Sequence, residues 1–408
     1  MKFLHKSTTM FILLSAIAIA LYWFLALRSD LMHQSSEILY SPPDAQSYLV
    51  VAEWIRGKVS DVPPATIVRP LGYPAFLAMI RSASIAPMAV VIVQFLLWLA
   101  SINLTAAAAW RLTGRCVWGY MAGAIMMTDI SLVLISWRAL TETCAVFTLS
   151  IWVYCIARID FANARGWRIF AALMPMALAT VIRPLFFMSF VAMTIAAVVM
   201  CWRRKGAVAW IFAASMPVAA QMAFMMAAHH LPTVSIIGKV TFRNYYMRQL
   251  AGKEGIVDRE GVRAALAADR PVSTAQTIRF LARNPAVAAR CFYDNILHGN
   301  LLQSSSDAPE YSRRAIVIET FNRAYVQAHM ALLPMVLLVL VGFRDQTAAK
   351  AAMMYLLFAF VIASCGISFW QGDRLALTAL PLWIPLYAVT VGRMAALLTP
   401  LLHGRRAE

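Results

Sequence analysis

Long apolar runs separated by short basic segments constrain this sequence more than any other feature. Hydrophobic residues make up 61% of the 408 residues and charged residues only 13%, against about 25% charged in an ordinary soluble domain. A soluble protein of this composition would have too little polar surface to cover its core. The sequence therefore predicts a helical membrane protein and excludes a soluble enzyme, a disulfide-stapled secreted module and a disordered chain.

Ten apolar windows approach or reach the length of about 20 residues that a transmembrane helix needs. We predict an all-α polytopic membrane protein with about ten transmembrane helices, of which the fifth and eighth are short. The windows lie near residues 8–27, 86–109, 117–136, 139–158, 168–182, 184–202, 207–228, 329–343, 350–369 and 375–396.

The net charge of +17 arises from 36 Lys and Arg against 19 Asp and Glu. Much of the basic charge lies between the apolar windows, and these clusters all fall on one side of a scheme with ten spans. The positive-inside rule then places both termini in the cytoplasm of a multi-pass protein of the bacterial inner (plasma) membrane. The charge indicates contact with the lipid bilayer, through anionic lipids or an anionic lipid-linked substrate, and not with nucleic acid, which would need a soluble basic face.

Two segments on the outer side are too long to be simple connections. They divide the chain into an N-terminal transmembrane module of residues 1–228, which includes a first periplasmic loop at 28–84, a large periplasmic loop at 229–328, and C-terminal transmembrane helices at 329–408. An amphipathic stretch from Asp44 to Val59 predicts an interfacial helix in the first loop. Helical patterns near 258–268 and 273–302 predict that the large loop is partly helical, and that its second helix lies along the membrane surface.

Charged residues at the outer ends of apolar windows are functional candidates, because ionisable side chains are costly there. A site with one or two carboxylates and several arginines suits anion binding combined with proton transfer. Arg183 interrupts an apolar run beside Pro184, which predicts a turn at the outer surface. The full set is Asp44, Arg69, Arg138, Glu142, Arg183, Asp373 and Arg374.

Several of these residues also have a purely structural interpretation. Asp44 follows two prolines and precedes a helical pattern, so it suits an N-cap as well as a base. Arg69 and Arg374 suit snorkelling to the membrane interface. Arg138 and Glu142 are spaced i, i+4 and suit mutual neutralisation. The residues alone leave these alternatives open.

The stretch DAQSYLVVAEWIRGKVSDVPPATIVRPLGYPAFLA, which begins at Asp44, resembles the first outer loop of GT-C glycosyltransferases. The similar branch contains the aminoarabinose transferase of lipid A and the protein O-mannosyltransferases, and is described as glycosyltransferase family 39. Its members have an Asp, a Tyr four residues on, an Ala four further, and an R-P-x-G-Y-P-like entry to the next span. Here these are Asp44, Tyr48, Ala52 and residues 69–74, with Leu71 where proline is common in bacterial relatives.

Three further stretches are similar to the same enzymes. SWRALTETCAVFTLSIWVYCIAR has Glu142 at the family's acidic position, and LATVIRPLFFM has Arg183 at the basic turn that faces the lipid phosphate. GDRLALTALPLWIPL resembles the family's last outer-end arginine, here Arg374, although Leu375 stands where a tyrosine is common. The similarity touches most of residues 1–205 and 370–396.

The resemblance implies an inverting transfer of a sugar from a polyprenyl-phosphate donor to an envelope lipid such as lipopolysaccharide, a glycan or a protein. The active site would face the periplasm, with Asp44 as the general base. Arginines would hold the phosphate leaving group and tyrosines would position the sugar or pack. The implied substrate-binding residues are Tyr48, Arg69, Tyr73, Arg138, Glu142, Arg183 and Arg374.

The sequence contains no HExxH, P-loop, GxSxG or helix-opening GxGxxG motif, so no cofactor is expected. A divalent cation is left open, because carboxylate ligands have no diagnostic spacing. Two alternatives to the transferase remain. An O-antigen-type polymer ligase would share the large late outer loop and the arginines, whereas a lipid or sugar flippase or transporter would place its charges in a cavity at the membrane midplane.

Overall fold

The computed structural model describes residues 2–28, 31–32, 35–160, 163, 165–201, 204–253, 274–304, 313–368 and 371–403. All regular structure within these ranges is helical. Among the described residues, seven helical segments are able to cross a membrane by length and composition, and two apolar helices are shorter, α6 (Cys116–Thr128) and α9 (Gly166–Ile182). The chain is therefore a helical membrane-embedded protein. The seven are α1 (Lys2–Arg28), α5 (Pro87–Thr113), α10 (Phe187–Cys201) together with the 3-10 turn η2 (Pro184–Phe186) that precedes it, α11 (Lys205–His229), α17 (Arg313–Gly342), α18 (Gln346–Cys365) and α20 (Leu380–His403).

Helices also cover the remaining predicted windows, although these helices are short. The window at 117–136 is covered by α6 and α7 (Ile130–Ile135), which are separated by a break at Asp129, and the window at 139–158 by α8 (Glu142–Arg158). The start of the eighth window at 329 was predicted too late, since α17 begins at Arg313. Polar residues such as Asn322 interrupt the apolar pattern there, and the helix tolerates Asn322 because this side chain has a buried hydrogen-bond partner, Asp373.

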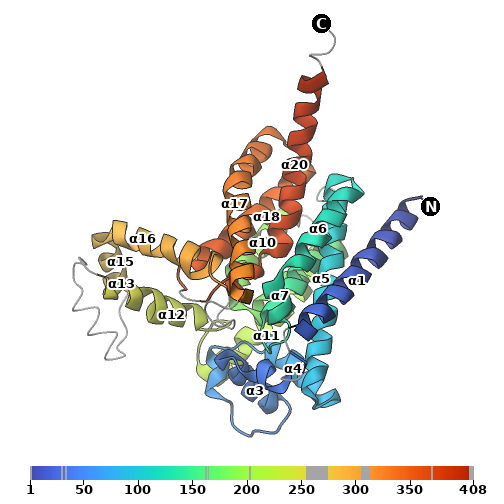
Figure 1. Cartoon of the computed structure of the whole chain (residues 1–408). Coiled ribbons are helices and arrows are strands. Elements are labelled where there is room, and N and C mark those ends of the chain that lie inside the picture. Colours follow the sequence, from blue (N-terminus) through green and yellow to red (C-terminus); the bar gives the residue numbers. More distant parts are fainter. Residues whose placement is uncertain are drawn as a thin grey trace.

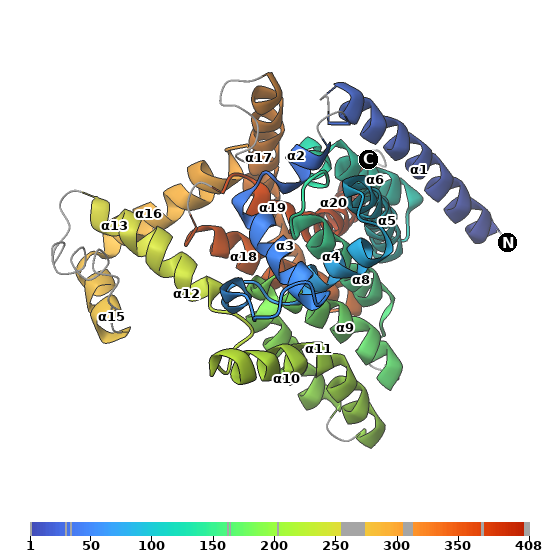
Figure 2. The same cartoon turned by 90° about the horizontal axis from the view of Figure 1, so that it is seen from below.

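Figure 1 shows the long helices grouped in a bundle, with both chain termini at the same end. At the opposite end lies a small helical cap formed by α2 (Ser35–Tyr40), α3 (Pro43–Ile55), the 3-10 turn η1 (Pro64–Ile67) and α4 (Gly72–Ala83). Seen from below in Figure 2, α3 and α4 lie across the end of the bundle. The cap therefore places residues of the first loop against the ends of the membrane helices.

One face of α3 packs against the other cap elements α4, η1 and α2, and the cap contacts the bundle helices α5 and α9 through α2 and α4. The buried residues of α3, which are Ala45, Tyr48, Val51 and Ala52, recur at helical spacing, which is the pattern of an amphipathic helix. The helix was predicted to extend to Val59, but it ends at Ile55, since Gly57 follows with a φ of 72°. A left-handed residue at this position terminates a helix and redirects the chain.

A helical arm projects sideways from the bundle (Figure 1). It consists of α12 (Ile237–Thr241), the π-helix η3 (Phe242–Met247), α13 (Arg248–Gly252), α15 (Thr274–Arg283), α16 (Pro285–Ile296) and the π-helix η4 (Leu297–Leu301). The predicted helix over 273–302 is broken at Asn284, because Pro285 has no N–H to continue it and instead begins α16. Cys291 on α16 is buried against Tyr246 and Leu250. The pattern predicted at 258–268 lies outside the described residues.

Gly72 brings the start of α4 against the end of α9. A Cβ atom on Gly72 would lie 2.5 Å from the carbonyl oxygen of Val181 and 2.7 Å from its carbonyl carbon. Backbone atoms cannot yield to such a contact as a flexible side chain could. Because Gly72 follows Arg69 closely and Val181 precedes Arg183, this contact fixes two arginine-bearing turns relative to each other.

We expect Gly72→Ala to push α4 away from α9 and to lower the free energy of unfolding by about 2 kcal/mol, as overpacking in a core does. Thermal unfolding of the detergent-solubilised protein measures this loss. Gly238→Ala is the matched control, because a Cβ there meets no atom within 4 Å, and it should change stability by less than about 0.5 kcal/mol. Equal stability of both variants would show that the α4–α9 contact is not tight.

Candidate functional site

Asp44 lies in the first turn of α3, where both of its carboxylate oxygens accept hydrogen bonds from arginines. Oδ1 is bonded to Nη2 of Arg69, and Oδ2 lies 2.7 Å from Nη2 of Arg374. The N-cap of α3 is Pro42, and no side chain caps the helix. The N-cap interpretation of Asp44 is therefore wrong, because its oxygens are used by the two guanidinium groups.

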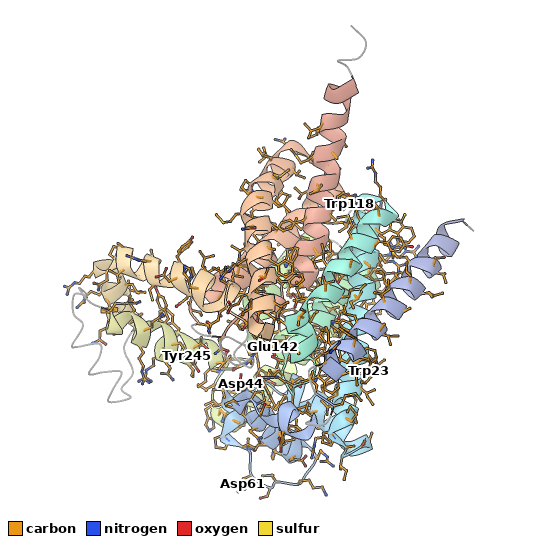
Figure 3. All side chains as sticks on the ribbon, viewed as in Figure 1. Trp23, Asp44, Asp61, Trp118, Glu142 and Tyr245 are labelled. Atoms are coloured by element: carbon orange, nitrogen blue, oxygen red, sulfur yellow. The ribbon has the colours of Figure 1, made fainter. Side chains whose placement is uncertain are left out.

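Arg374 connects Asp44 to a second carboxylate. Its Nε donates to Oε1 of Glu142, whose side chain is completely buried, and Nη1 of Arg183 lies 3.3 Å from the same oxygen. The five residues Arg69, Asp44, Arg374, Glu142 and Arg183 thus form a line of alternating charges, which we name the charge chain. Figure 3 shows Asp44 and Glu142 close together where the cap meets the bundle.

Four separate parts of the sequence supply the charge chain. The cap contributes Asp44 from α3 and Arg69 from the turn before α4, and Glu142 begins α8. Arg183 caps the C-terminus of α9, before a 3-10 turn that starts at Pro184, and Arg374 begins the short helix α19 (Arg374–Leu377). Residues that are distant in sequence therefore meet at one end of the bundle.

Arg69 is held by neutral groups as well as by Asp44. Its Nε donates to the hydroxyl of Ser47 at 2.9 Å, and its guanidinium lies 4.8 Å from the centre of the Tyr48 ring. The side chains of Arg69 and Arg374 are only 16% and 15% exposed. The snorkelling interpretation is wrong for both arginines, because they turn inward to carboxylates rather than outward to water.

Tyr48 and Tyr73 form a packed support below the charge chain. Their rings meet edge to face at 5.1 Å, and the hydroxyl of Tyr73 donates to Oε1 of Gln94 at 3.3 Å. Nε2 of Gln94 donates to the carbonyl groups of Ser136 and Arg138, at 2.9 and 2.8 Å. Tyr73 is fully buried, and through Gln94 it positions the segment that leads into α8. Tyr48 contacts Arg69 directly.

Arg138 lies in this segment and does not share a helical turn with Glu142, because α8 begins only at Glu142. The predicted i, i+4 geometry is therefore wrong. Arg183 and Arg374 are the ion partners of Glu142 described above. Burial and the nearby charge of Arg374 lower the pKa of Arg138 to about 10, so Arg138 is still charged at neutral pH.

The electrostatics of the charge chain keep Asp44 ionised. Burial acts to raise the pKa of Asp44, but Arg374 and Arg69 outweigh it, and the pKa lies below the ordinary value of 3.8. The Asp44 side chain remains 29% exposed, whereas Glu142 is inaccessible. Asp44 is thus the carboxylate that a ligand can reach, and an excess of arginines over carboxylates around it suits an anionic ligand.

Asp373 anchors the chain immediately before Arg374. Its Oδ2 accepts hydrogen bonds from Ser131 and, at 3.0 Å, from Nδ2 of Asn322, and its backbone N–H donates to the carbonyl of Gln303 at 2.9 Å. These bonds tie the start of α19 to α7 and α17. Asp373 therefore determines where the Arg374 guanidinium lies.

Sequence reasoning missed the neutral residues that support the site, namely Ser47, Gln94, Ser131 and Asn322. A usable signal existed for Gln94, which is an amide flanked by apolar residues inside the apolar window 86–109. Buried amides of this kind need partners, and Gln94 has three. Asn322 offered no such signal, since it lies outside the window that was recognised.

In the part of the chain that the structure describes, no three His, Cys, Asp or Glu side chains are arranged to hold a metal ion. A scan of known protein families gave no match to this chain, and a search of curated proteins gave no significant match. The arrangement of the charge chain is therefore the basis for inferring a function.

We expect Glu142→Gln to lower the free energy of unfolding by about 3 kcal/mol or more, because it leaves Arg183 and Arg374 buried beside a neutral amide. Glu53→Gln is the matched control, since Glu53 is also bonded to two arginines, Arg56 and Arg81, but is 23% exposed. Its loss should stay below about 1 kcal/mol. Denaturation followed by circular dichroism in detergent measures both, and equal losses would contradict the structural importance of Glu142.

Proposed function

We propose that this protein is a GT-C-type glycosyltransferase of about ten transmembrane helices in the bacterial inner membrane. It would transfer a sugar from a polyprenyl-phosphate donor to an envelope lipid, glycan or protein on the periplasmic side, with both of its termini in the cytoplasm. The observation that carries the proposal is the charge chain. An accessible carboxylate lies among three arginines at the end of an apolar bundle, where the headgroup of a lipid donor would arrive.

The reaction requires two changes of charge that these residues suit. The acceptor hydroxyl loses a proton to Asp44 as its oxygen attacks the anomeric carbon. The bond from that carbon to the phosphate oxygen breaks, and the leaving polyprenyl phosphate gains a negative charge, which Arg69, Arg183 and Arg374 stabilise. Attack opposite the leaving group inverts the anomeric configuration.

Donor binding would also activate the base. With both oxygens bonded to arginines, Asp44 is a weak base whose pKa lies below 3.8. A donor phosphate competes for the same guanidinium groups, and each arginine that turns to the phosphate lets the pKa of Asp44 rise. Nη1 of Arg183 lies 3.3 Å from Glu142 but makes no hydrogen bond. Its N–H groups can therefore donate to the phosphate. The carboxylate therefore becomes basic only when the donor is present.

An apolar groove supports a lipid donor. A cavity of about 860 Å³ lies between α8, α9, α10 and α18. Its lining begins at Met188 and Ser189, one turn beyond Pro184, and follows α10 to Cys201 at the far end. A polyprenyl chain in this groove would place its phosphate beside the Arg183 turn.

We expect Asp44→Asn to reduce sugar transfer by about 10²–10⁴-fold, as loss of a general base does. We expect Arg183→Ala to abolish transfer. Both variants should remain folded. Mass spectrometry of envelope lipids, glycans and glycoproteins measures this in a deletion strain that carries each gene. A sugar-sized mass should return with the wild type and with Glu53→Gln, but not with Asp44→Asn.

Recovery of that mass with Asp44→Asn would show that Asp44 is not the base. Accumulation of lipid-linked intermediates without any change in finished glycans would favour the flippase alternative. A change confined to long polymer chains would favour the polymer ligase.

A second prediction concerns the groove. Ala196→Trp places a bulky ring in the groove, and we expect it to weaken binding of a long-chain polyprenyl phosphate by about tenfold while leaving binding of geranyl phosphate nearly unchanged. Ile195→Trp, on the same helix but outside the groove and 59% exposed, is the control. Native mass spectrometry measures the bound lipids, and equal binding by both variants would place the lipid chain elsewhere.

A further inference from the structure

A second basic site lies at the opposite ends of the helices that hold Glu142 and Arg183. The helices α8 and α9 each contain 17 residues, so their far ends are about 25 Å from the charge chain. There Arg158 ends α8, Arg168 lies in the first turn of α9, and Arg111 lies in the last turn of α5. With Tyr154 and Trp167, these arginines line a cavity of about 300 Å³, which we name the basic pocket.

Two of the three guanidinium groups are held in place by aromatic side chains. Nη1 of Arg158 donates to the hydroxyl of Tyr154 at 3.0 Å, and the guanidinium lies 5.3 Å from the centre of that ring. The guanidinium of Arg168 lies 5.5 Å from the Trp167 ring. Such contacts orient an arginine without neutralising its charge.

The arginines of the basic pocket are not paired with carboxylates in the part of the chain that the structure describes. Within the ranges that the structure describes, no carboxylate lies at ion-pair distance from Arg111, Arg158 or Arg168. Asp160, which follows Arg158 by two residues, accepts hydrogen bonds instead from Gln346 and Asn163. The pocket thus differs from the charge chain, where each arginine faces a carboxylate.

The position of Arg168 adds a second argument. A helix carries a partial positive charge at its N-terminus, so an arginine in the first turn of α9 is electrostatically unfavourable. The first turn contains no acidic residue, and the N-cap Arg165 makes no side-chain capping bond. A bound anion would relieve this conflict, because it would interact with the guanidinium and with the helix N-terminus together.

We propose that the basic pocket binds the phosphate of an anionic lipid headgroup, in the leaflet opposite to the charge chain. A lipid fits better than a soluble phosphate for two reasons. Trp167 is 52% exposed beside the pocket, as tryptophans at a membrane interface are. Ile159 lines both the pocket and the apolar groove, so apolar surface for lipid chains begins where the basic pocket ends. This proposal does not depend on the transferase function.

The test uses the delipidated protein in a neutral detergent, with phosphatidylglycerol, phosphatidylcholine and inorganic phosphate as separate probes. We expect phosphatidylglycerol to be retained in native mass spectrometry and to raise the unfolding temperature, with phosphatidylcholine much weaker. Arg168→Gln and Arg111→Gln should each weaken phosphatidylglycerol binding by about tenfold, since each removes one charge-assisted bond. Arg115→Gln removes the same charge from an exposed position outside the pocket, and should bind like the wild type.

Unchanged phosphatidylglycerol binding by both pocket variants would overturn the proposal. Equal weakening by Arg115→Gln would overturn it too, because binding would then follow the overall charge of this face. Competition by inorganic phosphate at concentrations similar to the lipid would overturn the assignment to a lipid and leave a soluble phosphate as the ligand.

Discussion

The guanidinium of Arg374 holds the cap and the bundle together, because it is shared between a carboxylate on each. Nη2 bonds Asp44 on α3, and Nε bonds Glu142 at the start of α8. Removing these ions from water is costly, and the cost is offset only when every partner is in place. Ser131 and Asn322 hold Asp373, which holds Arg374, and Gln94 holds the segment before Glu142. The position of the cap on the membrane helices therefore follows from a network of polar contacts, and not from apolar packing alone.

The sequence was sufficient for features that depend on local pattern. Apolar windows predicted where helices form, and charges near the ends of those windows predicted a group of seven residues. The structure joins five of them in the charge chain, whereas Arg138 and Asp373 lie beside it. The sequence was insufficient for features that depend on packing. Asp44 and Arg374 are 330 residues apart, and no local pattern shows that they pair with each other rather than with water. Local rules also assigned some roles wrongly. Asp44 was in a good N-cap position, but its carboxylate binds two arginines instead. Arg138 and Glu142 have i, i+4 spacing, but they do not share a helical turn, because the helix begins at Glu142.

The two ends of α8 and α9 show two ways of placing arginine at a membrane. At the charge chain, Arg183 and Arg374 face carboxylates, so an incoming anion must compete for them and changes the protonation behaviour of Asp44 as it does so. At the basic pocket, Arg158 and Arg168 face aromatic rings, which orient them but do not neutralise them. Arginines that a ligand must win from carboxylates suit a ligand that binds transiently. Arginines without carboxylate partners suit a ligand that remains bound.

The shortness of α8 and α9 has a mechanical consequence. At 17 residues each, they extend about 25 Å, which is less than the hydrocarbon thickness of about 30 Å in a typical bilayer. In the proposed topology of ten spans, the bilayer would thin around them, or the polar groups at their ends would lie deeper than the surrounding lipid phosphates, at a cost of fractions of a kcal/mol per Å. In that topology the length of these two helices sets the depth at which the charge chain lies, and makes that depth sensitive to the thickness of the host membrane.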